Sequence, residues 1–193
     1  MGVLIILVGY LLGSISFSIV VAKRIRNIDI RDYGSGNAGA TNTLRVLGKG
    51  PAILVLLLDA AKGAAAVWIA HIFGAGNWVV VLAGVASIIG HNWPVFFKFH
   101  GGKGVATTIG MLLALAPIPA LLSVIVTVVI IALTRYVSLG SLVFVTLMPI
   151  MMYIWNNPAP YIIGTLLITI LGYVRHYENI MRLLQGKERK IGK

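Results

Sequence analysis

Three polar segments interrupt an otherwise apolar chain, and their residue types suit the binding of an anion. They cover residues 34–45, 90–104 and 175–182. Glycines expose backbone N–H groups and permit the tight curvature that surrounds a phosphate. Serine, threonine and asparagine add short hydrogen-bonding side chains, and arginine offers a planar fork that fits phosphate oxygens. We therefore expect these segments to bind a polar, anionic group.

The first segment matches G-x-G-x-x-G over residues 34–39, yet it does not predict a dinucleotide site. Such a site needs a preceding strand and a surrounding βαβ unit, whereas a basic loop precedes these glycines and an apolar run follows them. The alternative is a plain connecting loop, with glycine for turns and asparagine for caps. The polar side chains that favour binding are Ser35, Asn37, Thr41, Asn42 and Arg45.

The second segment ends in glycines directly before an apolar run. Gly101, Gly102 and Gly104 precede Val105, so free amides and a helix N-terminus are expected together, which is an anion site. Lys103 is not followed by serine or threonine, so the pattern is not a Walker A loop. We expect Lys103 to hold a phosphate; the alternative is an ordinary lysine at the cytoplasmic membrane surface.

The third segment places His176 at the end of the last apolar run. A histidine there can act as a general base or donate to an oxyanion, or it can be a simple polar cap. Residues 187–193 are expected to form a solvated basic end attracted to anionic lipid. The other polar residues at helical spacing are Arg175, Glu178, Asn179 and Arg182.

Composition indicates a single polytopic membrane domain over residues 1–193. The chain is 59% hydrophobic and only 11% charged, with a mean hydropathy of +0.95, far outside the soluble range. Its net charge of +11 is explained by cytoplasmic loops that collect lysine and arginine, not by nucleic acid. No cysteine is present, and the five carboxylates form no pair or cluster. We therefore expect no metal, disulfide or thiolate nucleophile.

Charge placement decides the predicted number of spans. Residues 105–134 would reach about 45 Å as one helix, whereas two helices would make the first one short. Two helices put Arg135 and the basic tail on the same side as the other cations. The prediction is an all-α integral membrane protein with seven helices, N-terminus outside and C-terminus cytoplasmic. The predicted spans are residues 3–22, 51–73, 77–97, 105–116, 120–134, 139–155 and 161–173.

Two charged residues lie inside a predicted span. Asp59 and Lys62 are three residues apart, so they share a helix face and can pair. A charge within a membrane favours a functional role, and the alternative is a structural pair whose charges neutralise each other.

The motifs resemble one known family along the whole chain and in the same order. Residues 35–45, 90–97, 101–107 and 175–183, with residues 13–15 and 59–63, are similar to bacterial acyl-phosphate:glycerol-3-phosphate acyltransferases. The resemblance implies transfer of a fatty acyl group from acyl phosphate to the 1-hydroxyl of sn-glycerol 3-phosphate, giving lysophosphatidic acid and phosphate. It also implies a bacterial inner-membrane enzyme with its site facing the cytoplasm and no cofactor. Its partners would be membrane lipids and an upstream enzyme that forms acyl phosphate.

The resemblance also implies roles for individual residues. Those expected to act in catalysis and to bind glycerol 3-phosphate are Ser35, Arg45, Lys103, His176 and Asn179. Those expected to bind the acyl-phosphate headgroup are Asn37, Thr41, Asn42 and the amides of Gly101, Gly102 and Gly104. Further substrate-binding residues are Gly36, His91 and Arg182.

Other functional classes share some of these features. A small organophosphate transporter would carry cationic motifs, but it would place them near the bilayer midplane. A lipid-binding structural protein would not need three separate polar motifs. Because the motifs gather at one predicted membrane edge, we favour an enzyme over a transporter. The chain has no cysteine and no evident base beside a serine, and acyl phosphate is already activated, so we expect direct attack of the glycerol hydroxyl on the acyl carbonyl.

Overall fold

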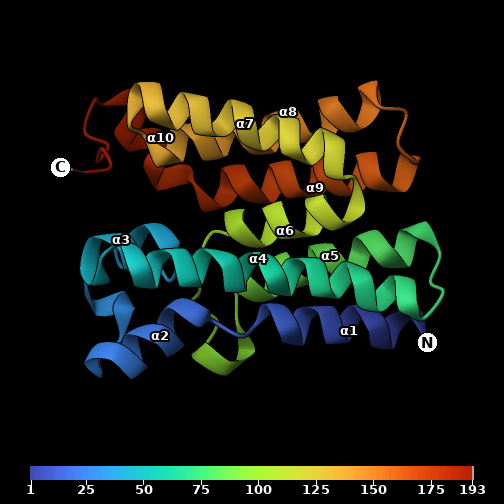
Figure 1. Ribbon diagram of the computed structural model, residues 1–193, viewed down its shortest axis with the longest axis horizontal. Helices are drawn as coiled ribbons and strands as arrows, with labels where there is room; N and C mark the ends of the chain where they lie inside the picture. Colours follow the sequence, from blue (N-terminus) through green and yellow to red (C-terminus); the bar gives the residue numbers. More distant parts are fainter. Residues whose placement is uncertain (193) are drawn as a thin grey trace. The chain divides into compact units, whose positions relative to one another are not determined.

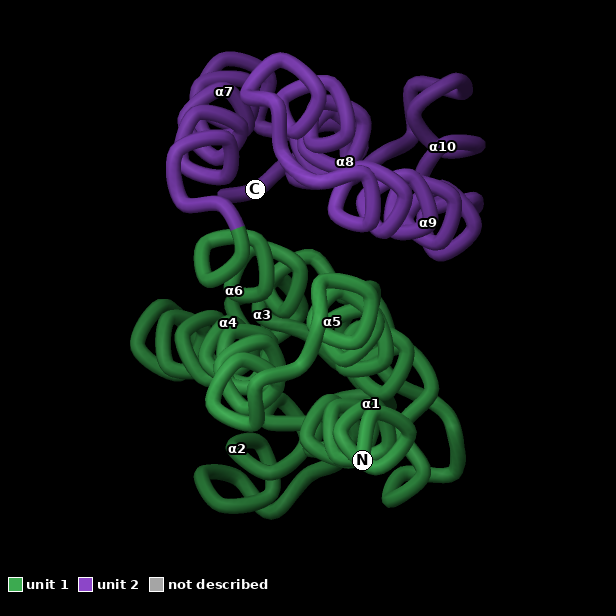
Figure 2. Tube along the Cα trace, turned by 90° about the vertical axis from the view of Figure 1, so that its right-hand side faces the viewer, with its two compact units in different colours: residues 1–115 green, residues 116–193 purple. Residues whose placement is uncertain are grey.

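Only helices, turns and loops occur among residues 1–192, which the computed structural model describes. The all-α class predicted from the sequence is confirmed. The chain forms two compact units, residues 1–115 and residues 116–193 (Figure 2).

The first unit holds the glycine-rich segments and the second holds the histidine segment. The helices of the first unit are α1 (Gly2–Gly13), α2 (Phe17–Arg26), α3 (Ala40–Leu47), α4 (Lys49–Ile72), α5 (Asn77–Asn92) and α6 (Val105–Leu115), with 3-10 turns η1 (Ile30–Asp32) and η2 (Val95–Phe97). The helices of the second unit are α7 (Pro117–Thr134), α8 (Val137–Ile154), α9 (Ala159–Arg175) and α10 (Tyr177–Leu184).

Several of these segments have the length and composition of membrane spans. Within residues 1–192, two shorter apolar helices, α6 and α9, accompany five longer apolar segments. The chain is therefore a multi-pass membrane protein, while the number of crossings and the side of each terminus remain predictions. The five longer segments are Gly2–Arg26, Lys49–Ile72, Asn77–Phe97, Pro117–Thr134 and Val137–Ile154.

The prediction of one continuous helix over residues 3–22 is wrong. α1 ends at Gly13 and α2 begins at Phe17, and the gap is visible between the two blue helices of Figure 1. Ser16 within it is extended (φ −89°, ψ 92°). Lys62 of α4 donates a 2.7 Å hydrogen bond from Nζ to the carbonyl oxygen of Ile15. A buried cation thus satisfies a carbonyl inside the break, where the helical ladder is interrupted.

Glycines allow two helix pairs in the first unit to pack very closely. A Cβ on Gly13 of α1 would overlap the Ser87 carbonyl of α5, and one on Gly63 of α4 would overlap the Thr107 carbonyl of α6. Membrane helices associate through such close packing, because lipid provides no hydrophobic drive between them. This packing fixes the helix ends from which the polar loops emerge.

The prediction that residues 105–134 form two helices is confirmed. α6 ends at Leu115 and α7 begins at Pro117. Ala116 between them is non-helical (φ −152°, ψ 84°), because a following proline disfavours the α region. Proline suits the first helical position, so α7 begins three residues before the predicted start at residue 120. In the second unit, α8 packs against both α7 and α9, and α10 contacts α8 and α9.

Candidate active site

Asn42 organises the first glycine-rich segment from inside the first unit. Its side chain is fully buried, and Nδ2 donates to the carbonyl oxygens of Ile30 (3.1 Å) and Tyr33 (2.9 Å). Its Oδ1 accepts a 2.8 Å hydrogen bond from the backbone N–H of Ser35. Gly34 adopts the left-handed region (φ 65°), and a Cβ there would overlap this Oδ1. The predicted substrate-binding residue Asn42 is therefore the support of the loop that carries Ser35.

The residues around Asn42 present polar groups at the surface of the first unit. Ser35 and Gly36 are exposed, and Asn37 is half-buried. Thr41 lies in the first turn of α3, and the exposed Arg45 follows four residues later, on the same face of the helix. The segment thus offers hydroxyls, amides and a guanidinium to a phosphate-sized anion.

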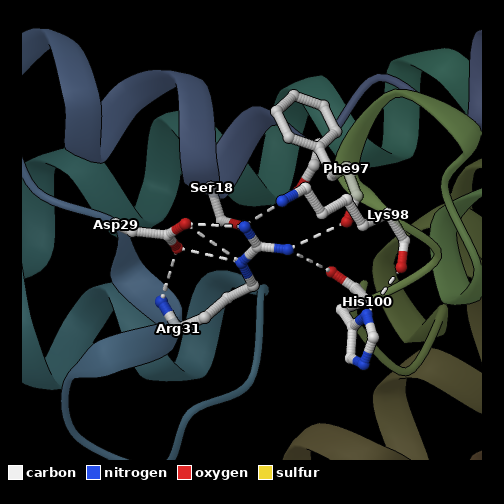
Figure 3. Close-up of polar contacts among 7 residues, drawn as sticks. Ser18, Asp29, Arg31, Phe97, Lys98 and His100 are labelled. Atoms are coloured by element: carbon white, nitrogen blue, oxygen red, sulfur yellow. Dashed lines mark hydrogen bonds and ion pairs between the residues drawn. The ribbon is translucent and has the colours of Figure 1, made fainter.

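Arg31 of η1, three residues before the first segment, binds the second segment (Figure 3). Its Nη2 lies 2.6 Å from Asp29 Oδ2, and its Nε donates to both carboxylate oxygens at 3.0 and 3.2 Å. Its Nη1 donates to the carbonyl oxygens of Phe97 (2.9 Å) and His100 (3.2 Å). The Arg31 guanidinium lowers the pKa of Asp29, so the pair is ionised at neutral pH.

The turn held by Arg31 has an unusual backbone. Lys98 and Phe99 are consecutive non-glycine residues with positive φ, 56° and 60°. Such conformations are costly and persist when the surrounding structure dictates them. Arg31 binds the carbonyls on either side of this pair, so it stabilises the turn that leads into the glycines.

The second glycine-rich segment rests on His91 and leads into α6. Gly102 donates its backbone N–H to the His91 carbonyl at 3.0 Å. Gly104 is left-handed (φ 80°), and its carbonyl accepts from both the backbone N–H and Oγ1 of Thr108 at 2.8 Å. The first amides of a helix have no partner within the helix, so the α6 N-terminus favours an anion. Lys103 is half-buried within this turn.

The two glycine-rich segments meet at Gly102. A Cβ added to Gly102 would overlap Nε2 of the buried His91 and would approach the carbonyl oxygen of Ala38. Ala38 belongs to the first segment, so only glycine leaves room for the two segments and the imidazole to converge. The structure thereby brings the two glycine-rich segments into contact at Ala38, His91 and Gly102. The other predicted residues of the first unit lie on the same two segments: Ser35, Gly36, Asn37, Thr41, Asn42, Arg45, Gly101, Lys103 and Gly104.

The predicted pairing of Asp59 with Lys62 is confirmed. Lys62 Nζ lies 2.8 Å from Asp59 Oδ1, and both side chains are buried. A third member was not predicted: His91 Nδ1 lies 3.5 Å from the same oxygen. The pair therefore reaches the histidine on which the glycines rest.

The second unit carries His176 at the junction of α9 and α10. The side chain is buried, and Nδ1 lies 2.8 Å from the carbonyl oxygen of Gly172. A carbonyl can only accept, so Nδ1 carries the proton in this contact and the neutral ring keeps its lone pair at Nε2. That tautomer suits a general base or a hydrogen-bond acceptor for a hydroxyl.

Glu188 gathers the remaining polar residues of the second unit. Its Oε1 accepts from Asn179 Nδ2 (2.6 Å) and Ser138 Oγ (3.0 Å), and its Oε2 accepts from Arg182 Nε (2.8 Å). Burial raises the pKa of the Glu188 carboxyl, but the hydrogen bonds from Arg182, Asn179 and Ser138 outweigh burial, so the pKa lies below its usual value. The predicted residues Asn179 and Arg182 are therefore held by one carboxylate.

The basic residues Lys187, Arg189 and Lys190 of the tail are exposed, as predicted, but the tail is also attached to the rest of the second unit. Glu188 is only 6% exposed in its side chain. Ile191 donates its backbone N–H to the Arg135 carbonyl at 2.8 Å, and Arg135 Nη2 donates to the Gly192 carbonyl at 3.2 Å. These contacts fold the tail back onto the α7–α8 connection. Lys193 lies outside the described residues.

Sequence reasoning missed two residues that hold the site, Arg31 and Glu188. Both are charged residues outside the longer helices. On sequence alone, Arg31 is one of the arginines that collect on the cytoplasmic side of a membrane protein, and that pattern gives it no separate role. Asp29 two residues before Arg31 was a local signal for a side-chain pair. Glu188 is the single carboxylate within a run of basic residues, which was a comparable signal.

Comparison with known proteins places these elements in a family. Residues 3–186 match the glycerol-3-phosphate acyltransferase family. The chain is 51% identical to the glycerol-3-phosphate acyltransferase of Halalkalibacterium halodurans, covering 100% of this chain and 97% of that one. It is 54% identical to that of Shouchella clausii, covering 97% and 95%.

Solved structures give the same result. The crystal structure of PlsY, an integral membrane glycerol 3-phosphate acyltransferase, in its glycerol 3-phosphate form has a TM-score of 0.94 and 41% identity, covering 99% of this chain and 96% of that one. The lysophosphatidic acid form has a TM-score of 0.92 and 40% identity, covering 99% and 95%. The fold, the glycine-rich segments and the sequence agree: the chain belongs to the glycerol-3-phosphate acyltransferase family.

Proposed function

We propose that this acyltransferase moves a fatty acyl group from acyl phosphate to the 1-hydroxyl of sn-glycerol 3-phosphate. The products are lysophosphatidic acid and inorganic phosphate. One observation carries the proposal: the chain matches, over 99% of its length, a structure solved with glycerol 3-phosphate and a structure solved with lysophosphatidic acid. Those molecules are the acceptor and the product of this reaction.

The residue types of both units support two phosphorylated substrates. We assign the binding of glycerol 3-phosphate to the side chains of Ser35, Arg45, Lys103, His176 and Asn179. The acyl-phosphate headgroup is assigned to Asn37, Thr41 and the amides of residues 101–104, with Gly36 and Arg182 as further substrate contacts. Asn42 and His91 were also predicted to bind substrate. Asn42 binds the backbone of the first glycine-rich segment, and His91 binds that of the second.

The mechanism follows from an acyl donor that is already activated. The hydroxyl oxygen forms a bond to the acyl carbonyl carbon, the bond from that carbon to the phosphate oxygen breaks, and phosphate leaves. The hydroxyl proton passes to Nε2 of His176 or to the departing phosphate. Orientation of the two substrates and neutralisation of their charges supply most of the rate. Since the chain has no cysteine, a thioester intermediate has no place in this scheme.

The membrane arrangement is part of the proposal. Seven helices of one polytopic domain cross the bacterial inner membrane, with the N-terminus outside and the C-terminus in the cytoplasm. The cations of the loops support this orientation through the positive-inside rule. The substrates then reach the site from the cytoplasm, where an upstream enzyme forms acyl phosphate.

The direct test is reconstitution of the reaction. Purified full-length protein is given radiolabelled acyl phosphate and glycerol 3-phosphate, and lysophosphatidic acid and phosphate are scored. We expect equal amounts of both, and no lysophosphatidic acid with acyl-CoA as the only donor. A folded protein that uses acyl-CoA and ignores acyl phosphate would refute the donor assignment.

A matched pair of variants tests the lysine assignment in the same assay. Lys103→Ala should lose at least about tenfold in kcat/KM, the equivalent of roughly 1.4 kcal/mol. Lys98→Ala removes an exposed lysine of the same segment and should stay close to wild type. Equal effects of the two substitutions would make Lys103 an ordinary surface cation.

A second experiment separates direct transfer from a serine acyl-enzyme. Wild-type protein receives labelled acyl phosphate without glycerol 3-phosphate and is then denatured. We expect no stoichiometric label on the protein and intersecting lines in double-reciprocal plots. Label that is chased into lysophosphatidic acid, together with ping-pong kinetics, would point to Ser35 as nucleophile.

A further inference from the structure

Three ionisable side chains lie in the interior of the first unit, where none is needed for solubility. Asp59, Lys62 and His91 are 1%, 4% and 5% exposed. A nitrogen of each of the other two side chains approaches the same oxygen, Asp59 Oδ1: Lys62 Nζ at 2.8 Å and His91 Nδ1 at 3.5 Å. Burying charges has a large desolvation cost, and apolar residues of similar volume are often at least as stable. The presence of these three buried side chains is therefore better explained by what they hold in place than by stability alone.

One end of the cluster reaches the break in the first apolar segment. Lys62 Nζ donates to the carbonyl oxygen of Ile15 at 2.7 Å, and its ammonium lies 5.6 Å from the ring centre of Phe17. Lys62 thus links α4 to the residues between α1 and α2. Because the same ammonium contacts Asp59, that carboxylate is held in a fixed orientation on α4.

The other end reaches the junction of the two glycine-rich segments. His91 presents Nδ1 to Asp59, so the opposite nitrogen, Nε2, faces away from α4. A Cβ at Gly102 would overlap that Nε2 and approach the Ala38 carbonyl, so the ring edge lies where the segments meet. The His91 carbonyl also accepts the Gly102 N–H at 3.0 Å. The imidazole is therefore the contact between the buried cluster and the proposed phosphate site.

We propose that Asp59 is a positioning residue for acyl transfer. Through Nδ1 it orients the His91 ring, and the ring sets the spacing between Ala38 of the first segment and Gly102 of the second. Lys62 keeps the carboxylate in place and fixes it to the helix break. Neither Asp59 nor Lys62 contacts substrate. This inference rests on the proposed function, because the segments it positions are those assigned to the phosphates.

A purely structural role makes a different prediction. If Asp59 and Lys62 only neutralise each other, any well-packed neutral pair should restore both folding and activity. If Asp59 positions His91, the replacement must also keep an oxygen at the position that faces Nδ1, which is 3.5 Å away in the wild type. The two roles therefore differ in how they respond to two neutral pairs, one with and one without that oxygen.

The experiment compares those two neutral pairs in the full-length protein. Asp59→Asn with Lys62→Met keeps an amide oxygen for His91, whereas Asp59→Leu with Lys62→Met removes it. Melting temperature in detergent and the kcat and KM for both phosphorylated substrates are measured. The two pairs should melt at similar temperatures, because neither leaves a buried unpaired charge and both lose the same Lys62 hydrogen bond to the Ile15 carbonyl. The leucine pair should have a kcat/KM about tenfold to a hundredfold below that of the asparagine pair, mainly through KM.

A histidine variant and its control complete the test. His91→Gln should raise the KM of a phosphorylated substrate at least about tenfold, while His71→Gln, at an exposed histidine of α4, should match wild type. Equal kinetics of the two double variants, or wild-type kinetics for His91→Gln, would overturn the positioning role. If neither double variant folds, His91→Gln alone decides. Absence of activity in the wild-type protein would instead count against the proposed function.

Discussion

Glu188 offers the sharpest test of how the second unit holds its polar residues. One carboxylate accepts hydrogen bonds from Asn179, Ser138 and Arg182, at 2.6 to 3.0 Å. In Glu188→Gln the amide oxygen can still accept from Asn179 and Ser138. The amide NH₂ group then faces Arg182 Nε, so a donor meets a donor. The substitution removes the Arg182 contact, turns the other two into hydrogen bonds to a neutral amide, and leaves the size of the side chain unchanged.

The size of the effect follows from that single contact. A hydrogen bond to a charged group contributes about 1.5–3 kcal/mol, and the Glu188 side chain is only 6% exposed. We expect a loss of this order in the free energy of unfolding. Because the lost contact holds Arg182, which is also proposed to contact substrate, kcat/KM should fall by about tenfold or more.

The lowered pKa of Glu188 predicts how its contribution to stability changes with pH. The folded-state pKa of Glu188 is lowered, so its contribution to stability is present above the ordinary carboxyl pKa and is lost as pH falls through the folded-state pKa. Wild type should therefore lose this contribution on acidification, and Glu188→Gln should lack that part of the acid-linked loss.

The assays are melting temperature at neutral and acidic pH and steady-state kinetics. The matched control is Glu178→Gln, because Glu178 also contacts Arg182, at 3.5 Å, but its side chain is 82% exposed. Surface pairs of this kind contribute little, so this variant should resemble wild type. If Glu188→Gln and Glu178→Gln behave alike in both measurements, the reasoning from the Glu188 contacts is refuted.

Three further predictions concern the loops. Arg45→Lys keeps the charge but loses the planar fork, so kcat/KM should fall about tenfold or more; wild-type kinetics would show that any cation suffices. Arg31→Lys cannot bind Asp29 and two carbonyls at once, so proteolysis within residues 97–100 should become faster, and unchanged cleavage rates would show that the turn is stable alone. Topology is tested by impermeant thiol labelling of single-cysteine variants, and labelling of positions 98 and 185 from opposite faces would contradict seven helices. We expect labelling from the cytoplasm for Ser35→Cys, Lys98→Cys and Gln185→Cys, and from outside for Asn157→Cys.

The apolar pattern predicts most helices because hydropathy measures what a membrane span requires. It also places the α6–α7 boundary, since Pro117 disfavours a helical conformation at the residue before it. It fails at residues 14–16, where the break depends on the Lys62 ammonium reaching the Ile15 carbonyl from another helix. No local sequence signal encodes a contact between residues 47 positions apart.

For the site, too, the sequence predicts what depends on residue type and does not predict what depends on contacts between distant residues. Residue type identifies Lys103 and Arg45 as groups that suit a phosphate, because the chemistry is carried by the side chain itself. Residue type does not distinguish Asn42, which binds loop backbone, from Asn37, which is half-buried at the edge of the same loop. That distinction arises from burial, which only the folded chain defines.

Three of the five carboxylates pair with a cation beside the segments of the proposed site. A free carboxylate beside a phosphate would weaken binding, yet cations must be held in place by something. Asp29 pairs with Arg31, Asp59 with Lys62, and Glu188 with Arg182. In each case the negative charge is neutralised by its partner, and the pair fixes a segment that carries proposed substrate contacts. Arg45 and Lys103 are the cations proposed to bind the two phosphates.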